Sequence, residues 1–464
     1  MTYLLTDFGS TYTKVMAANV ETGQIVAFAK AFTTIETDVR IGFEAAKKEV
    51  LAQIGGNLNF GKSLAASSAA GGLKMVSCGL VPDLTAKASR LAAASAGAKV
   101  VRTYSYELTE VEQEEIDAIA PDILLLSGGI DGGNKQVLLH NAAIIANVPR
   151  NFSVIVAGNR SAAAEAKEIL QRGGKEVLVC ANVMPAFGKL NIEPAKAAIR
   201  DLFIKNIITA KGLDSAQKMM DMEIIPTPLA VFEACELLSK GCNEEKGLGE
   251  IMAYDLGGAT TDVYSMADGA PKIPNAFISG IIEPFAKRTV EGDVGMRYSQ
   301  EALYGLICEE SGGFSDICNE TALQWLDICA ANPGILPLGD YAQFNHVDRA
   351  FAAEAIRISA VRHVGSKERV FTSSGEVFTQ TGKDLTQVQY VIGSGGAVIN
   401  AENPADILKY AIYSPRDLNA LKPLKPKLLL DAANCLAAMG LLGRFAPGAA
   451  LKIMKESFAE IKYS

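Results

Sequence analysis

The chain has 464 residues, of which 49% are hydrophobic and 21% are charged, and a net charge of −8. This length exceeds one typical domain, and the composition is that of a well-packed globular protein. The net charge is acidic, and the sequence has no basic stripe. No apolar run is long enough to cross a membrane, and the N-terminus runs straight into a strand without a signal peptide. We therefore expect a cytoplasmic protein with no nucleic-acid or membrane partner.

The first segment, residues 1–58, predicts the opening of an α/β lobe. A hairpin pairs strands at 3–5 and 14–19, a third strand covers 25–32, and a helix covers 41–54. The hairpin turn lies in the run Asp7-Phe8-Gly9-Ser10-Thr11-Tyr12-Thr13-Lys14. Such a turn can direct backbone N–H groups and hydroxyls toward an anion, and its leading carboxylate can hold Mg²⁺ through water.

Residues 59–185 change character and predict an inserted domain. Strands at 74–80, 99–104, 122–127, 154–157 and 176–181 alternate with helices at 82–96, 109–119, 134–147 and 162–171. Uninterrupted apolar strands between amphipathic helices are typical of a doubly wound parallel sheet. The glycine-rich stretch 128–133 could hold an anion at the start of the following helix.

Residues 186–250 complete the first lobe with two helices, the second beginning at the Ile225-Pro226-Thr227-Pro228 run. Residues 251–427 form a second lobe, with helices expected at 302–329 and 347–364. Residues 428–464 are expected to be closing helices, the first opening at Leu428 and covering 432–442.

The second lobe repeats the first motif. Asp255-Leu256-Gly257-Gly258-Ala259-Thr260-Thr261-Asp262 again follows an apolar strand and leads into another strand. A third element, Val391-Ile392-Gly393-Ser394-Gly395-Gly396-Ala397-Val398, is a short strand that runs into a glycine turn and a helix. Glycines at this turn would let a base and a ribose lie against the backbone.

The three elements in this order resemble the phosphate-1, phosphate-2 and adenosine motifs of the actin, sugar-kinase and heat-shock-chaperone superfamily. The resemblance implies a two-lobed ATPase fold with an inserted Rossmann-like domain, and ATP/ADP and Mg²⁺ as ligands held between facing loops. It assigns Mg²⁺ and the attacking water to Asp7 and Asp255. It assigns the phosphates to Gly9, Ser10, Thr11, Thr13, Gly257, Gly258, Ala259, Thr260 and Thr261, the tuning of the second loop to Asp262, and adenosine to Gly393, Ser394, Gly395 and Gly396. The role of Lys14 is left open between a phosphate contact and a solvated strand lysine.

Two further stretches carry resemblances. Residues 96–101 and 122–129 are similar to the cobalamin-binding domain of adenosylcobalamin mutases, but the Asp-x-His-x-x-Gly motif that supplies a cobalt-ligating histidine is missing. An ordinary Rossmann-like insert is the equal alternative. Residues 225–233 resemble the connecting helix of heat-shock-type members, in which a Glu before Pro-Thr positions the attacking water. Ile225 stands there in this chain, so we expect slow hydrolysis unless Glu223 or Glu233 substitutes.

Taken together, the whole chain resembles the accessory protein of glutamate mutase and ornithine aminomutase. The resemblance implies an ATP-dependent reactivating chaperone that drives inactive cobalamin out of mutase subunits. Whether the chain forms a homo-oligomer stays open. The alternatives are a small-molecule kinase of the same fold, an electron-activating ATPase with an iron–sulfur cluster, for which Cys235 and Cys242 are weak candidates, and a nucleotide-dependent scaffold.

Overall fold

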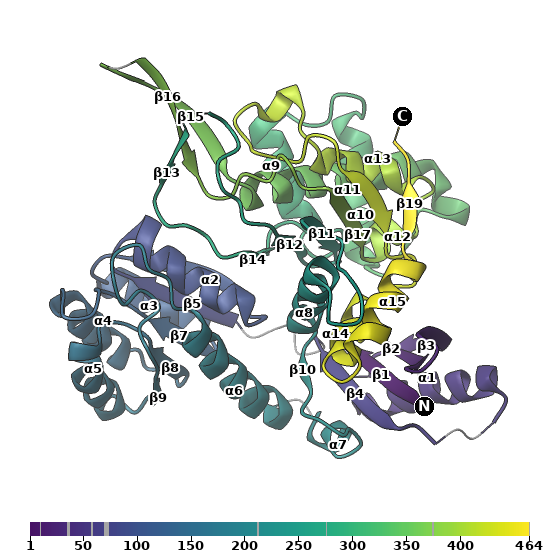
Figure 1. The fold of residues 1–464 in the computed structure, drawn as a ribbon, viewed down its shortest axis with the longest axis horizontal. Coiled ribbons are helices and arrows are strands. Elements are labelled where there is room, and N and C mark those ends of the chain that lie inside the picture. Colours follow the sequence, from purple (N-terminus) through teal and green to yellow (C-terminus); the bar gives the residue numbers. More distant parts are fainter. Residues whose placement is uncertain are drawn as a thin grey trace. The chain divides into compact units, whose positions relative to one another are not determined.

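The computed structural model describes residues 1–9, 11–34, 38–56, 59–68, 74–210, 213–274, 276–373 and 375–463. The chain divides into two compact units. Unit 1 comprises Met1–Leu237, Gly241–Lys246 and Leu436–Ile453, and unit 2 comprises Leu238–Lys240, Gly247–Cys435 and Met454–Ser464. Figure 1 labels the elements of both units.

Unit 1 is built on a five-stranded sheet in the order β10-β4-β1-β2-β3. Neighbours β1, β2 and β3 are antiparallel, whereas β4 and β10 run parallel to β1. The strands are β1 (Thr2–Phe8), β2 (Tyr12–Asn19), β3 (Gln24–Phe32), β4 (Lys62–Ser67) and β10 (Ile225–Pro226). The helices are α1 (Val39–Ile54), α7 (Leu213–Gln217), α8 (Thr227–Lys240), α14 (Leu436–Gly443) and α15 (Pro447–Ser457). Helix α1 covers β2 and β3, and α14 covers β1 and β4.

Helices α8 and α14 touch within unit 1 because Gly440 has no side chain. A Cβ built on Gly440 would lie 1.8 Å from the carbonyl oxygen of Ala230, so no other residue fits there without moving the helices apart. This contact fixes a helix from the end of the chain against one that begins beside β10.

Unit 2 repeats the strand order of unit 1. Its six-stranded sheet has the order β14-β12-β11-β17-β18-β19, with β11, β12 and β14 antiparallel and with β17 and β18 parallel to β11. The strands are β11 (Ile251–Leu256), β12 (Thr261–Met266), β14 (Ala286–Glu291), β17 (Tyr390–Ser394), β18 (Lys427–Leu430) and β19 (Ala459–Ile461). The duplicated order confirms the predicted α/β class and the actin/sugar-kinase-like architecture with its inserted parallel sheet.

The helices of unit 2 enclose an apolar core around Trp325 and Phe351. They are α9 (Gln300–Ser311), α10 (Asn319–Ala331), α11 (Asn345–His363), α12 (Gly396–Ile399) and α13 (Pro404–Leu408), with the short turns η2 (Gly339–Phe344), η3 (Lys409–Ala411) and η4 (Pro415–Asp417). The single helix predicted over 302–329 is wrong, because it breaks into α9 and α10 where Gly312 adopts a left-handed conformation.

Leu428–Leu430 was expected to open a helix and instead forms β18, buried in the sheet beside β17. Three leucines in a row fit a buried parallel strand as well as a helix, and sheet pairing decides between the two. The closing helix begins only at Leu436.

The insert holds a five-stranded parallel sheet in the order β6-β5-β7-β8-β9. Its elements are β5 (Lys74–Gly79), η1 (Pro82–Ala86), α2 (Lys87–Ser95), β6 (Lys99–Ser105), α3 (Glu110–Ile119), β7 (Ile123–Leu126), α4 (Gln136–Ala146), β8 (Ser153–Val156), α5 (Arg160–Arg172), β9 (Glu176–Val179) and α6 (Glu193–Ala210). Helix α2 packs against α6 and α4 against α5, as in a doubly wound sheet. Strand β4 pairs with β1, so the insert's sheet begins at β5 and not at residue 59.

A second, smaller sheet of unit 2 joins β13 (Ala276–Ser279), β16 (Gly375–Thr381) and β15 (Ser366–Thr372) in that order. We call this sheet the arm (Figure 1). In the part of the chain that the structure describes, no helix combines the length and apolarity that crossing a bilayer requires.

Candidate functional site

The first predicted phosphate turn connects β1 to β2. The backbone N–H of Gly9 donates to Tyr12 O over 3.1 Å, and a Cβ on Gly9 would lie 2.6 Å from that oxygen. The turn therefore closes because residue 9 has no side chain. Thr11 is exposed at its tip, where its hydroxyl is available to a ligand. Ser10 lies outside the described residues.

Asp7 lies one residue before the end of β1 and is held by two neighbours. The Thr227 hydroxyl donates to Asp7 Oδ1 over 2.6 Å, and Lys14 Nζ lies 3.6 Å from Asp7 Oδ2. Lys14 is the cross-strand partner of Asp7, which accounts for its proximity. Thr227 reaches Asp7 because β10 runs parallel to β4 and β1, so the carboxyl ends of these strands meet at one edge.

Sequence reasoning placed Thr13 among the phosphate ligands, and the structure places its hydroxyl elsewhere. Thr13 is fully buried, and its Oγ1 lies 3.0 Å from Thr33 Oγ1, so this hydroxyl links β2 to the end of β3. Thr227 was not assigned a role from the sequence. The Pro226-Thr227 run was the only sequence feature that could have pointed to Thr227. The pairing of β10 with β4 is what brings Thr227 to Asp7.

The second turn connects β11 to β12 by the same bond. Gly257 N donates to Thr260 O over 3.0 Å, as Gly9 N does to Tyr12 O. A following segment braces this turn from outside: Met296 N donates to Gly257 O and Arg297 N to Gly258 O. The Ser299 hydroxyl donates to Ala259 O over 2.6 Å. Tyr298 N also donates to Gly258 O over 2.9 Å, so four bonds to backbone carbonyls brace the turn.

Asp262 is the second residue of the return strand β12 and forms a buried ion pair with Arg288. The Arg288 guanidinium lies 2.5 Å and 2.7 Å from Asp262 Oδ1 through Nη2 and Nε, and Arg288 is 2% exposed. Burial opposes the charge of Arg288, but Asp262 and Tyr264 together more than offset it, and the pKa of Arg288 lies above its ordinary value. Thr260 Oγ1 lies 3.4 Å from Asp262 Oδ2. The sequence analysis did not identify Arg288 as the partner of Asp262.

Thr261 resembles Thr13 in being committed to the fold. It is fully buried, and its hydroxyl donates to Val294 O over 2.8 Å. In each turn, then, the threonine that enters the return strand stabilises the protein, and the threonine nearer the tip is the better candidate for a ligand.

The third motif adopts the predicted strand, glycine turn and helix, with Gly395 at φ +90° before α12. A Cβ on Gly395 would lie 2.3 Å from Leu256 O, and one on Gly393 would lie 2.6 Å from Leu408, so these glycines serve close packing. Around Gly396 the nearest atom to such a Cβ is Asn400 Nδ2 at 3.8 Å, which leaves open space.

Ser394 introduces another carboxylate that the sequence did not single out. Its hydroxyl donates to Asp431 Oδ2 over 3.1 Å, and Cys435 N donates to Asp431 Oδ1 over 2.9 Å. Asp431 is fully buried at the end of β18, and Ser394 is opposite Asp255 in the register of β11 and β17. The parallel strands of unit 2 thus end in a linked polar row.

Ile225 occupies β10 and is 1% exposed, paired with Ala66 of β4. Of the two acids suggested as substitutes, Glu233 accepts from Arg444 through both oxygens over 2.6 Å each, and Glu223 is exposed ahead of β10. Glu233 is therefore occupied by a bidentate pair that braces α8.

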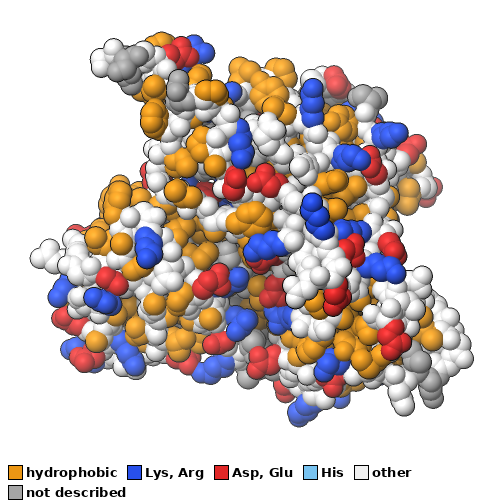
Figure 2. Space-filling model, in the orientation of Figure 1, with side chains coloured by type: hydrophobic (Ala, Val, Ile, Leu, Met, Phe, Trp, Pro, Cys, Tyr) orange, Lys and Arg blue, Asp and Glu red, His pale blue; other side chains and the backbone are white. Residues whose placement is uncertain are grey.

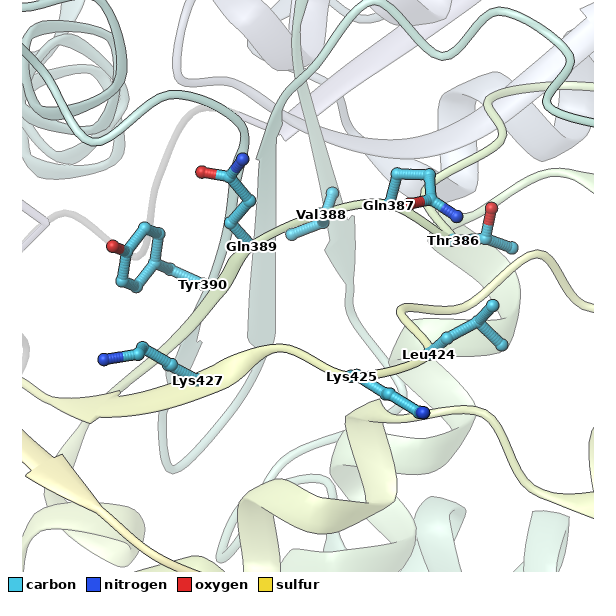
Figure 3. A pocket seen from close by; sticks show the side chains of 8 residues that line it. All are labelled: Thr386, Gln387, Val388, Gln389, Tyr390, Leu424, Lys425 and Lys427. Carbon is cyan, nitrogen blue, oxygen red and sulfur yellow. The ribbon is translucent and has the colours of Figure 1, made fainter.

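A groove of about 600 Å³ lies in unit 2 away from these turns (Figure 3). It is formed where β17 and β18 begin, whereas Gly395 and Asp431 lie just past the ends of those strands. In Figure 3 Tyr390 and Lys427 point to one side and Leu424 and Lys425 to the other. Lys427 also pairs with Glu460 over 3.1 Å. The groove is thus distinct from the predicted nucleotide site.

Comparison with known proteins decides the family. The model of a family described as MutL protein matches residues 3–458. The chain belongs to the MutL protein family. A relative named Protein MutL, from Clostridium tetanomorphum, is 43% identical over 464 residues, covering 99% of each chain. The family predicted from the sequence, that of the mutase accessory proteins, is thereby confirmed.

Solved structures similar to this MutL-family chain are far more distant. The ligand-bound xylulose kinase of Lactobacillus acidophilus is 11% identical at a TM-score of 0.35, covering 99% of this chain and 93% of the kinase. A glycerol dehydratase reactivase is 10% identical at a TM-score of 0.35, covering 95% and 99%. The family assignment rests on the sequence match, and the architecture rests on the duplicated sheet order.

Proposed function

We propose that this MutL-family protein is an ATP-dependent reactivating factor that releases inactive cobalamin from an adenosylcobalamin-dependent mutase. One observation carries the ATP-dependent part. Two sheets of the same strand order carry an aspartate, Asp7 or Asp255, one residue before the end of their central strand, and a turn closed by the same backbone bond follows. A repeated aspartate and anion-binding turn are what a triphosphate with a hydrated Mg²⁺ requires.

In this proposal the described residues take distinct roles. Asp7 and Asp255 bind Mg²⁺ through its waters, since hard carboxylate oxygens suit that ion. Gly9, Thr11, Gly257, Gly258, Ala259 and Thr260 hold the phosphates. Gly396 lies against adenosine, because open space adjoins its Cα. Thr13 and Thr261 support the turns from within. Lys14 partly neutralises Asp7, from 3.6 Å away.

Hydrolysis is expected to be slow without a client. An apolar side chain, Ile225, is buried where a water-positioning carboxylate would stand, and Glu233 is held by Arg444. Slow basal turnover suits a factor that acts only on an inactivated enzyme. ATP can drive release only if the nucleotide states differ in affinity for the client, so turnover should rise when the client binds.

The test is Mg-ATP turnover by the purified protein, alone and with a hydroxocobalamin-inactivated aminomutase, with cobalamin release followed by absorbance. We expect the mutase to stimulate turnover and released cobalamin to accumulate only with ATP. Asp7→Asn and Asp255→Asn should abolish both effects. Asp316→Asn, which removes one negative charge from an exposed position, is the matched control and should behave as wild type.

ATP turnover that the mutase does not change, without any release of cobalamin, would contradict the reactivating role. It would point to phosphoryl transfer onto a small molecule. Absence of ATP binding by the folded wild-type protein would contradict the assignment of the turns themselves.

A further inference from the structure

The arm has two edge strands, β13 and β15, on either side of β16. In Figure 1 it extends away from the helices of unit 2. An edge strand presents unpaired backbone groups to other chains, and proteins normally protect such edges with charges, proline, bulges or covering segments. The two edges of the arm differ in this protection.

Strand β15 is protected. It carries the charged run Lys367-Glu368-Arg369, and Lys367 N donates to Asn419 O over 2.9 Å, so its first part is also covered. Arg369 and Glu376 form an ion pair across β15 and β16 at 3.0 Å. A second chain would have to desolvate these charges to pair here.

Strand β13 is not protected. Its residues Ala276-Phe277-Ile278-Ser279 include no charge and no proline, and its pairing with β16 has no register shift. Phe277 is 62% exposed and Ile278 is 36% exposed. Ile282, just beyond the strand, is 65% exposed. Figure 2 shows hydrophobic side chains at the surface of this part of the molecule. Such a strand is a predicted site of strand addition.

The strand is also held ready for pairing. Lys383, 2% exposed, donates through Nζ to the carbonyls of Pro284 and Phe285 over 3.0 Å and 2.7 Å, which fixes the segment that follows β13. Gln380 Nε2 donates to Gly269 O over 2.8 Å and fixes the end of the neighbouring strand β16. A fixed edge loses little conformational entropy when a partner strand pairs with it.

We propose that β13 pairs antiparallel with β13 of a second copy, across a two-fold axis perpendicular to the sheet. This symmetry places residues of the same face opposite each other, so Phe277 meets Phe277 of the other copy and Ala276 meets Ile278. Aromatic cross-strand pairs are favourable, and an uncharged strand meets its own copy without repulsion. The inference does not depend on the proposed ATP-driven function.

The direct test is symmetrical cross-linking. Phe277→Cys in a Cys318→Ser background, which removes the exposed native thiol, places two thiols opposite each other. Opposed residues of antiparallel strands have Cα atoms about 4.5–5.5 Å apart, within disulfide range. Diamide takes up the two electrons and two protons released as the S–S bond forms. We expect a cross-linked dimer on non-reducing gels.

Phe371→Cys in the same background is the matched control, since Phe371 is a phenylalanine of the arm, 75% exposed, on the protected strand. It should give little dimer. Equal cross-linking of both variants, or none of either, would overturn the proposal.

Sedimentation equilibrium supplies a second readout without cysteine chemistry. Wild type should show concentration-dependent dimerisation, and Phe277→Lys should shift it at least tenfold toward monomer, because like charges would then face each other. Thermal unfolding should match wild type, since the side chain is mostly exposed. A wild-type protein that stays monomeric at every concentration would contradict the proposed dimer, even if the variant then proved unable to bind a mutase.

Discussion

The two predicted phosphate turns are closed by the same backbone hydrogen bond and differ in the charge opposite their aspartate. In unit 1 the cross-strand partner of Asp7 is Lys14, whereas in unit 2 the cross-strand partner of Asp255 is Asp262. The first pair is attractive as it stands. The second puts like charges opposite each other, which destabilises a hairpin. Unit 2 resolves this with Arg288 from the third strand of its sheet. One turn geometry can therefore be stabilised locally or through the sheet.

The two ion pairs, Lys14 with Asp7 and Arg288 with Asp262, also differ in how strongly water weakens their attraction. Lys14 is 29% exposed, and its attraction to Asp7 is weakened by water. Arg288 and Asp262 are desolvated, so their attraction only repays the cost of burial, and loss of one partner leaves a buried charge uncompensated. The second turn should be the more sensitive to mutation of its charged partner, and the following predictions test that.

The largest effect is expected for Arg288→Met. It removes the guanidinium that neutralises the buried Asp262, and should lower the free energy of unfolding by about 3–5 kcal/mol. Urea denaturation measures it. Adding Asp262→Asn to Arg288→Met should restore part of the loss. A loss below 1 kcal/mol, or a double variant no better than the single one, would show that the pair does not stabilise this turn.

Thr227→Val tests the hydroxyl that unit 1 uses to hold its aspartate. Hydrogen bonds to a charged group contribute about 1.5–3 kcal/mol, and the free energy of unfolding should fall within that range. If Thr227 orients Asp7 for Mg²⁺, the Mg²⁺ concentration for half-maximal ATP turnover should rise. Thr227→Ser should restore both quantities. A Val variant with unchanged Mg²⁺ dependence would reduce Thr227 to a structural role.

The turn glycines allow a matched comparison. A Cβ on Gly9 would lie 2.6 Å from Tyr12 O, but one on Gly257 would lie 3.0 Å from Thr260 O. We expect Gly9→Ala to cost about 1–3 kcal/mol of stability through overpacking, and Gly257→Ala to cost less. Thermal unfolding of the two variants side by side measures the difference. A larger loss of stability for Gly257→Ala than for Gly9→Ala would mean that the two turns close differently.

The smallest effect is expected for Lys14→Met. Partly exposed ion pairs contribute about 0–1 kcal/mol, so stability should change little. If Lys14 contacts a phosphate, ATP affinity should nevertheless fall, and isothermal titration would detect this. Unchanged affinity would assign Lys14 to neutralising Asp7 alone.

Much of the fold was predictable from the sequence because it depends on residues close together in the chain. Asp-turn-hydroxyl patterns indicate the turn between β1 and β2, although β1 runs on to Phe8 and β2 begins at Tyr12, beyond the predicted 3–5 and 14–19. The alternation of apolar strands and helices predicted the parallel sheet of the insert. Patterns within a few residues reflect backbone preferences and hydrophobic period, which a sequence displays directly. The boundary of the insert was misplaced because β4 has little pattern of its own and is defined by pairing with β1.

The sequence alone determined the strand-turn-strand motifs, their duplication and the family, because each depends on residues adjacent in the chain. Tertiary structure decided which side chains meet. Thr227 reaches Asp7 from 220 positions away, Arg288 neutralises Asp262 from the third strand, and Thr13 and Thr261 turn inward. It also decided that Leu428–Leu430 is a strand, since a buried apolar run takes its conformation from the neighbour with which it can form hydrogen bonds.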